Sequence, residues 1–273
     1  APFLLPKVRA GYKYGDQTAV DSLVRDGLWC PFEDWPMGSA AEHTATACGV
    51  SRAEQDRFAA RSHQRAAAAW ERGDFAAEVV PVTVGSGPKA KAVTRDEGIR
   101  PDTTAEGLAK LRPSFKADGG TVTAGNASQL SDGAAVVVVA SAAAVTRNGW
   151  APLARVVAYT TSGVAPRDLF TAPIPAVRGV LDRAGWQSSG VDLFELNEAF
   201  AAQMVACGRG LGLDDERVNV HGGAIALGHP IGASGARVLT TLVHALHRRG
   251  SRTGVASLCL GGGNAVAMAV ERV

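Results

Sequence analysis

Two stretches of the chain carry apolar residues at helical spacing. The first follows Ser51 and Glu54, which together form a capping box, and Gly73 ends it. The second runs from Gly232 to Gly250 and has basic residues in its last turn, where a helix favours positive charge. Both patterns predict amphipathic helices.

Other patterns predict strands and loops. Residues 79–84 are mainly apolar but contain Pro81, so we expect an edge strand, because proline cannot donate to a ladder. Residues 134–140 are apolar without alternation, which predicts a core strand covered on both faces. Thr104 opens a short helix. Residues 1–50 show little periodicity, and we expect an irregular segment there.

Helices and strands alternate after a turn at residues 148–149. The pattern predicts a strand over 153–160, a helix over 175–184, a strand over 192–196, a helix over 198–209, a strand over 217–220, a helix over 232–249, and strands over 254–259 and 264–270. This alternation is typical of an α/β fold.

The composition of the chain argues against several classes of function. The chain is 46% apolar and 20% charged, as in ordinary globular proteins, and its longest apolar runs are too short for a bilayer, so we expect no membrane segment. The net charge is +2 and the basic residues are scattered, so nucleic acid is not an expected partner. Four cysteines lie far apart with no Cys-x-x-Cys pair, which argues against a metal site and favours a reducing compartment.

Three segments at predicted strand ends carry side chains capable of chemistry. They are Asn197-Glu198-Ala199-Phe200, residues 221–230 with Gly228-His229-Pro230 at their end, and Cys259 followed by three glycines after Leu260. Because loops at one set of strand ends converge in α/β sheets, we expect a single site. The glycines leave room for a substrate at the His229 ring, and the loop amides behind Cys259 are suited to bind an oxyanion.

Each segment also has a purely structural interpretation. A loop histidine often bonds to backbone, and a buried cysteine is commoner than a reactive one. The three glycines at 261–263 fit a hairpin turn, and Asn197 fits the N-cap of the helix expected after it. From the residues alone these alternatives stay open.

Taken together, the three segments resemble the thiolase family. Its C-terminal half carries Asn-Glu-Ala-Phe, Gly-Gly-x-Ile-Ala-x-Gly-His-Pro-x-Gly-x-Ser-Gly and Cys-x-Gly-Gly-Gly in this order, as this chain does. The likeness extends upstream through residues 125–128 and 110–113, and weakly to 9–16, so it covers essentially the whole chain. It implies a thiolase-like α/β fold with a complete C-terminal βαβαβαββ half.

The resemblance also implies a division into domains. Residues 1–129 correspond to the family's loop domain, which binds coenzyme A (CoA) and supports oligomerisation. Residues 130–149 correspond to a remnant of the N-terminal domain, and residues 150–273 to the C-terminal domain. On this interpretation the N-terminal half is largely missing.

The family's chemistry supplies roles for these residues. Thiolases interconvert two acyl-CoA molecules and a 3-ketoacyl-CoA plus free CoA, through an acyl-enzyme on a cysteine. By position, His229 polarises that nucleophile, and Asn197 holds a water that donates to the thioester oxygen. Cys259 is the second acid and base, with the Gly261 N–H in a second oxyanion hole.

Substrate binding follows from the same resemblance. The family uses no metal or redox cofactor, since CoA thioesters are its substrates. The positions that the family pattern places along CoA are Leu28, Met37, Arg100, Phe115, Ala124, Ser128, Ala199 and Phe200. Arg100 is expected at the nucleotide end.

The family's nucleophile belongs to a Cys-x-Ser-Gly motif, and this motif does not occur in the 273 residues. Cys48 lies near a helix start, but we reject it as a substitute because it falls in the loop-domain portion. We therefore expect a thiolase fragment, either a partial gene product or one chain of a split enzyme with a separate N-terminal thiolase chain. For the full-length family we expect a homodimer or tetramer, acting in the cytoplasm in fatty acid metabolism.

Two other functions compete with this interpretation. A decarboxylating ketosynthase has a histidine in place of the second cysteine, and Cys259-Leu260-Gly261 argues against it. A non-catalytic CoA-binding remnant stays open. His221, where many relatives have Asn, and Trp35-Pro36-Met37, where short-chain members have His-Met, leave the acyl-chain preference undecided.

Overall fold

The computed structural model describes all residues, 1–273, and has a four-stranded sheet at its centre. The strand order is β7-β10-β9-β8, and the strands are β7 (Ala154–Gly163), β10 (Asn264–Arg272), β9 (Thr253–Leu260) and β8 (Leu193–Leu196). β10 runs antiparallel to β7 and β9, whereas β8 and β9 are parallel. The long-range pairing brings residues near 196 next to residues near 257.

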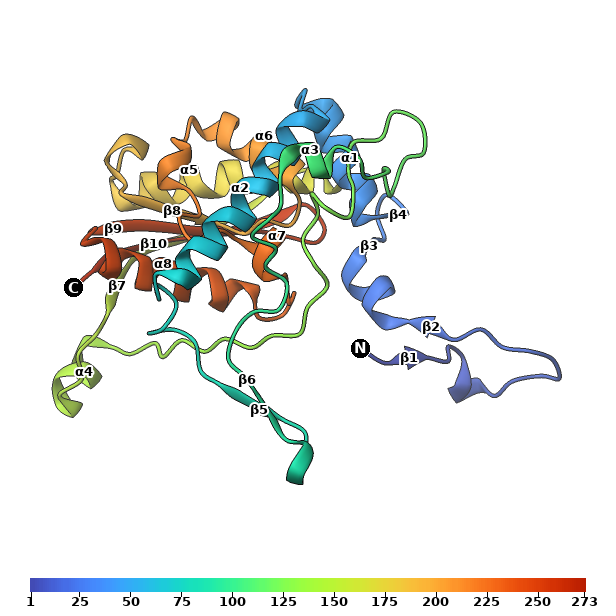
Figure 1. Ribbon diagram of the computed structural model, residues 1–273, viewed down its shortest axis with the longest axis horizontal. Coiled ribbons are helices and arrows are strands. Elements are labelled where there is room, and N and C mark those ends of the chain that lie inside the picture. Colours follow the sequence, from blue (N-terminus) through green and yellow to red (C-terminus); the bar gives the residue numbers. More distant parts are fainter.

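Helices cover both faces of this sheet, because successive strand residues point to opposite sides. Phe194 and Val255 join one core with α5 (Pro173–Ala184) and α6 (Ala201–Leu211). Their neighbours Leu193 and Ala256 join a second core with α8 (Ser234–Arg249). Figure 1 shows α5 and α6 on one side of the sheet and α8 on the other. The sheet and its helices confirm the predicted α/β class.

A third layer of helices packs on α6. Its longest member, α2 (Arg52–Glu71), contacts α6 and the short α7 (Ala224–Leu227), while α1 (Met37–Ala47) contacts α6 as well. The predicted capping box starts α2, since Ser51 Oγ accepts from the Glu54 N–H and the Ser51 N–H donates to the Glu54 carboxylate. Thr104 caps α3 (Ala105–Leu108) through the Gly107 N–H, as predicted.

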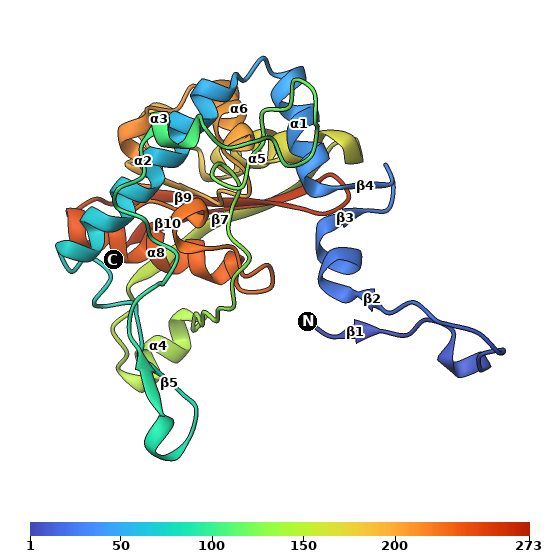
Figure 2. The same cartoon turned by 45° about the vertical axis from the view of Figure 1, so that its right-hand side comes forward.

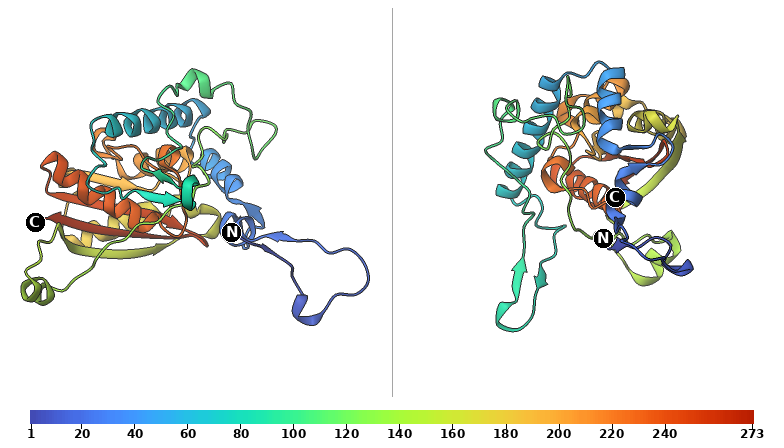
Figure 3. Two further views of the ribbon diagram at one scale, coloured as in Figure 1. Left: turned by 60° about the horizontal axis from the view of Figure 1, so that its bottom comes forward. Right: turned by 90° about the vertical axis from the view of Figure 1, so that its right-hand side faces the viewer.

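The remaining elements are short and lie mostly at the periphery. They are β1 (Phe3–Leu4), β2 (Val20–Asp21), β3 (Trp29–Cys30), β4 (Trp35–Pro36), β5 (Val82–Val84), β6 (Lys91–Val93), α4 (Ala142–Asn148), and the 3-10 or π turns η1 (Val8–Ala10), η2 (Leu23–Leu28), η3 (Gly87–Lys89), η4 (Pro166–Thr171), η5 (Ser188–Gly190) and η6 (Asp215–Arg217). Figures 2 and 3 show the β1–β2 segment and the β5–β6 hairpin extending away from the sheet. No helix is long and apolar enough to cross a membrane.

The predicted core strand over residues 134–140 is wrong. The segment forms no strand and makes no backbone hydrogen bond, and Val136, Val138 and Val139 are 80–85% exposed. A strand needs backbone partners on at least one edge, and no other strand of this chain lies beside it. The apolar composition of residues 134–140 predicts burial, but the chain offers no neighbouring strand that would bury them.

Two boundaries in the C-terminal half also differ from the prediction. The strand expected over 217–220 is reduced to single bridges, because Asn219 adopts a φ of 46° that interrupts extended backbone. Its side chain replaces the ladder, since Oδ1 accepts from the Leu196 N–H and Nδ2 donates to the Leu196 carbonyl, both at 2.8 Å. The helix expected from residue 198 begins at Ala201, with Phe200 as its N-cap.

The irregular segment predicted over residues 1–50 contains one full helix, α1. It buries Gly, Ala, Thr and Glu rather than large apolar side chains, so its sequence has little hydrophobic periodicity. Pro36 occupies its N-cap without a side-chain bond, so the usual start signal is absent too.

Candidate active site

Asn197 and His229 meet at the carboxyl end of β8. Asn197 follows the strand directly, and its N–H donates to the Ser257 carbonyl of β9 at 2.9 Å, which fixes the backbone. From there the Asn197 side-chain Nδ2 lies 3.2 Å from His229 Nε2. Asn197 Oδ1 is buried and has no hydrogen-bond partner. The N-cap interpretation of Asn197 fails, because the next helix begins only at Ala201.

The other side of the imidazole fixes its tautomer. His229 Nδ1 lies 2.5 Å from Ser234 Oγ, and the Ser234 hydroxyl donates its single hydrogen to the Pro230 carbonyl at 3.0 Å. Ser234 Oγ therefore accepts from Nδ1–H. This leaves the lone pair on Nε2, where it accepts from the Asn197 amide. The ring presents an unprotonated nitrogen toward Asn197.

Burial and the nearby Arg237 charge lower the His229 pKa to about 4. The imidazole is therefore neutral near pH 7, which is the form that acts as a general base. Arg237 itself pairs with the buried Glu195 at 3.0 Å, between Nη1 and Oε1. This contact holds the Arg237 guanidinium, whose positive charge lowers the His229 pKa.

Cys259 lies near the end of β9, two residues beyond Ser257. It packs with Met37 and Phe200 around a small buried cluster that includes Ala199. Burial raises the pKa of the Cys259 thiol to about 12. The Cys259 thiol is therefore protonated near pH 7.

The glycines after Cys259 form a hairpin turn between β9 and β10, as the structural interpretation predicted. Gly262 and Gly263 have φ of 78° and 86°, and a Cβ on Gly263 would stand 2.3 Å from the Val164 carbonyl oxygen. Only glycine fits there. Gly261 is exposed, and its carbonyl accepts from Asn264 Nδ2 at 3.2 Å. The turn therefore fixes the backbone beside the thiol.

The buried side chain of Glu198 links the segments that carry Asn197 and His229. Glu198 accepts hydrogen bonds from Ser62 Oγ at 2.6 Å, Asn219 Nδ2 at 2.9 Å and the Ile225 N–H at 3.1 Å. Burial, opposed by these bonds, raises the pKa of Glu198. These hydrogen bonds connect Glu198, which directly follows Asn197, to α2 through Ser62 and to the segment before His229 through Ile225.

The structure brings five of the predicted CoA-binding residues together. Phe115 and Phe200 meet edge to face at 6.5 Å between ring centroids, and a Cβ on Gly38, next to Met37, would overlap the Phe115 ring. The Ser128 N–H donates to the Ala199 carbonyl at 3.0 Å. These contacts join five residues into one wall, Met37, Phe115, Ser128, Ala199 and Phe200, and Cys259 packs on the same cluster as Met37, Ala199 and Phe200.

The other three predicted CoA-binding residues lie outside this wall. Arg100 is exposed, and its N–H donates to His63 Nδ1 of α2 at 3.2 Å. Leu28 ends η2, which approaches the segment after His229 because Gly27 packs against Ile231. Ala124 is exposed in the loop before Gly125. None of the three belongs to the cluster on which Cys259 packs.

None of the other three cysteines has surroundings that would activate its thiol. Cys30 and Cys207 are buried, and burial raises the pKa of Cys207. Cys48 ends α1 rather than beginning a helix, and burial followed by the Asp168 charge raises its pKa. None of these thiols lies at a helix N-terminus that would activate it.

Sequence reasoning missed the supporting residues. Ser234 and Glu198 stand inside the recognised motifs but received no role, although a serine five residues after a histidine at a helix start is a plausible ring partner. Glu42 gave no signal at all. Its buried carboxylate accepts from the N–H groups of Thr121 and Val122, and so fixes the loop that carries Ala124 and Ser128.

A neutral histidine base, an amide donor and a thiol beside an apolar wall, all set on an α/β sheet, define an acyl-transferring class of enzyme. Comparison with known proteins gives the family. The family model described as "Thiolase, N-terminal domain" matches residues 1–143, and "Thiolase, C-terminal domain" matches residues 150–272. The chain belongs to the thiolase family.

Individual relatives agree with this assignment. An acetyl-CoA acetyltransferase of Pseudomonas aeruginosa is 50% identical, and one of Escherichia coli K12 is 49% identical; each match covers 100% of this chain and 69% of the relative. The crystal structure of the Bacillus anthracis acetyl-CoA acetyltransferase superposes with a TM-score of 0.96 at 43% identity, over 100% of this chain and 69% of that one. Human mitochondrial 3-ketoacyl-CoA thiolase in complex with CoA gives 0.92 at 43% identity, over 100% and 68%.

These matches test our prediction that the chain is a thiolase fragment. Both thiolase domains are represented in the chain, so the expectation of a largely missing N-terminal half is not confirmed. The absence of Cys-x-Ser-Gly from the 273 residues remains a fact of the sequence. The relatives, which are named as enzymes, do not favour the non-catalytic alternative.

Proposed function

We propose that this chain performs the acid–base part of a thiolase reaction on acetyl-CoA and a short 3-ketoacyl-CoA. The observation that carries the proposal is the Asn197–His229 contact, in which Nε2 holds its lone pair toward an amide donor. The names of the relatives support acetyl-CoA as the substrate.

In the proposed condensation, the Cys259 thiolate removes a proton from the methyl group of acetyl-CoA. The electron pair of the C–H bond moves into the enolate, and the Gly261 N–H donates to its oxygen. The enolate carbon then attacks the carbonyl carbon of an acyl thioester, and the C–S bond of that thioester breaks, so that its sulfur leaves as a thiolate. In cleavage the Cys259 thiol protonates the leaving carbanion, for which a thiol with a pKa of about 12 is already in the required form.

His229 and Asn197 serve the other thioester in this proposal. The neutral Nε2 takes the proton of the attacking thiol, and the charged imidazolium with a water held by Asn197 then donates to the carbonyl oxygen. Asn197 Oδ1 supports the water, because it is a buried acceptor without a protein partner. We further propose that the acylated thiol is none of the four cysteines of these 273 residues.

Deuterium exchange at the α-carbon of acetyl-CoA tests the proposal, because exchange needs the base and the oxyanion donors but no acyl-enzyme. The chain is incubated with acetyl-CoA in heavy water, and the methyl signal is followed by proton NMR. We expect exchange that scales with protein concentration and saturates with acetyl-CoA. Exchange no faster than in buffer alone would refute the proposed role.

CoA binding is tested separately. We propose that Arg100 contacts the nucleotide end of CoA, since it is exposed beside α2 and carries a fixed positive charge. Calorimetry should show CoA binding about 10-fold weaker in Arg100→Ala, the cost of one charge-assisted bond. Arg147→Ala, at an exposed position of α4, is the matched control. Equal affinities of the two variants would remove Arg100 from the site.

A further inference from the structure

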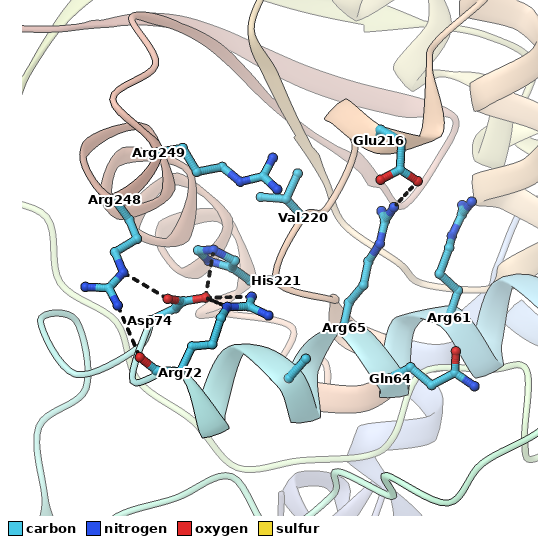
Figure 4. Close-up of a pocket in the computed structure, with 11 residues that line it drawn as sticks. Arg61, Gln64, Arg65, Arg72, Asp74, Glu216, Val220, His221, Arg248 and Arg249 are labelled. Carbon is cyan, nitrogen blue, oxygen red and sulfur yellow. Dashed lines mark hydrogen bonds and ion pairs between the residues drawn. The ribbon is translucent and has the colours of Figure 1, made fainter.

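A cavity lies between the C-terminal half of α2, the C-terminal end of α8 and the segment 216–221. Its volume is about 630 Å³, which is the size of a small-ligand site. Only two of its eleven lining residues are hydrophobic, so an apolar ligand would gain little there. Five arginines line it, as Figure 4 shows: Arg61, Arg65, Arg72, Arg248 and Arg249.

The positive charge in this cavity exceeds the negative charge around it. Asp74 pairs with both Arg72 and Arg248, and Glu216 pairs with Arg65. Asp215, outside the lining, pairs with Arg61. Five guanidinium groups thus face three carboxylates, a surplus of two positive charges.

Arg249 is the free member of the group. Its side chain is exposed and forms no ion pair or hydrogen bond with the rest of the chain. Arg65, in contrast, is held in place, since it donates to the carbonyls of Asp215 and Val218 at 2.9 and 2.7 Å. The cavity therefore combines a guanidinium held by backbone carbonyls with an unpaired one, an arrangement that suits recognition of a phosphate group.

His221 gives an independent indication of a ligand. Its side chain lines the same cavity and is 2% exposed, yet its Nδ1 has no hydrogen-bond partner. Its Nε2 lies 3.6 Å from Asp74 Oδ2, which favours the hydrogen on Nε2 and the lone pair on Nδ1. Buried polar atoms are nearly always satisfied, and a P–OH group is a donor that fits this acceptor.

We propose that this arginine cavity binds a small phosphate-bearing anion at a site separate from the thiolase centre. His229, Cys259, Asn197 and Arg100 are absent from its lining. Gln64, which does line it, donates to the Thr103 carbonyl at 3.2 Å, so the loop that carries Arg100 borders the cavity. The experiment must therefore separate the cavity from the proposed CoA site.

Calorimetric titration with inorganic pyrophosphate at constant ionic strength tests the proposal, with sodium sulfate as the competing simple anion. We expect saturable binding to one site, weakened about 10-fold in Arg249→Gln. The control Arg147→Gln makes the same change of charge on α4 and should bind as the unmodified chain does. Both variants alter exposed side chains, and their circular dichroism melting curves verify folding.

Each outcome decides the question. Binding that is weakened about 10-fold in Arg249→Gln and less affected by Arg100→Ala supports the cavity, whether or not CoA turns over. Binding that is unchanged in Arg249→Gln, or weakened at least as much by Arg100→Ala, would overturn the proposal, and weakening by Arg100→Ala alone would place pyrophosphate in the CoA site. Absence of saturable binding, or equal binding of pyrophosphate and sulfate, would overturn it as well.

Discussion

His229 Nε2 and Asn197 Nδ2 lie 3.2 Å apart, although 32 residues separate them along the chain. The parallel pairing of β8 with β9 places Asn197 at a strand end, and the Gly-rich loop before α8 returns the imidazole to it. Ser234 completes the arrangement from the far side of the ring. The contact links the fold directly to the proposed chemistry.

When a separate thiolase chain supplies the nucleophilic cysteine, the Asn197→Ala substitution should lower acyl transfer by about 100-fold, the usual cost of losing one donor to an oxyanion. The His229 lone pair would remain, so binding of acetyl-CoA should change little. Steady-state kinetics of that mixture, together with calorimetric binding, separate the rate of acyl transfer from the affinity for acetyl-CoA. A similar loss in binding and in rate would instead indicate a structural role.

Ser234→Ala should remove the tautomer preference of His229, because Nδ1–H loses its acceptor. Nitrogen-15 NMR of the labelled imidazole is the direct readout, and we expect the signal of a protonated Nδ1 to weaken. Thr240→Ala alters another α8 hydroxyl, one that bonds only to the Ala236 carbonyl, and should leave the ring signals unchanged. Identical spectra of the two variants would contradict the assignment of the tautomer.

The rate of α-proton exchange should rise about tenfold per pH unit between pH 7 and 9, after subtraction of the Cys259→Ala rate. The reason is that the thiol pKa is about 12, so the thiolate fraction grows in proportion to hydroxide throughout this range. A plateau below pH 8 would show that the reacting base has a much lower pKa.

Protonation of the buried histidines should affect stability with a defined sign. Burial lowers the His63 pKa from 6.5 to about 4, so the unfolded chain binds the proton first as pH falls. Relative to His63→Gln, the wild-type chain should lose about 1.4 kcal/mol per pH unit from pH 6.5 toward 4. The pKa values of Glu78 and Glu195 are raised to about 7 and about 8, so protonation of these two groups stabilises the folded chain as pH falls. The contribution of His63 is therefore isolated only by comparing the wild-type chain with His63→Gln.

Denaturant unfolding of both proteins at several pH values measures the difference. The same substitution at the exposed His247 serves as the control for loss of a histidine as such. A free-energy difference between wild type and His63→Gln that stays constant from pH 6.5 to 4 would mean that His63 is not buried in the folded chain.

No acyl-enzyme should form on these 273 residues. The thiols of Cys48, Cys207 and Cys259 have raised pKa values, and Cys30 is buried. Intact-mass measurement after incubation with acetyl-CoA should therefore show no stoichiometric acetyl adduct, and thiolysis of acetoacetyl-CoA should be absent. A stable adduct mapped to one of the four cysteines would identify a nucleophile that we have not recognised.

Much of the fold was predictable where the sequence signals are local. The capping box at Ser51, the glycine after α8 and the three ordered motifs each specify backbone conformation within a few residues. Residues 134–140 were not predictable, since their composition indicates burial but not which partner provides it. The Asn219 side chain replaces a strand ladder, and no periodicity reveals that. Glu42 accepts a hydrogen bond from the N–H of Thr121, which lies 79 residues further along the chain. Such a contact can be recognised only in the folded structure.

Comparison of acetyl-CoA exchange in Cys259→Ala and Cys207→Ala tests the central claim most directly. Both changes remove a largely buried thiol, but only Cys259 lies against the wall formed by Met37, Phe115, Ser128, Ala199 and Phe200. The account predicts that Cys259→Ala exchanges at the buffer rate while Cys207→Ala, if folded, keeps the wild-type rate. Wild-type exchange in Cys259→Ala would contradict it.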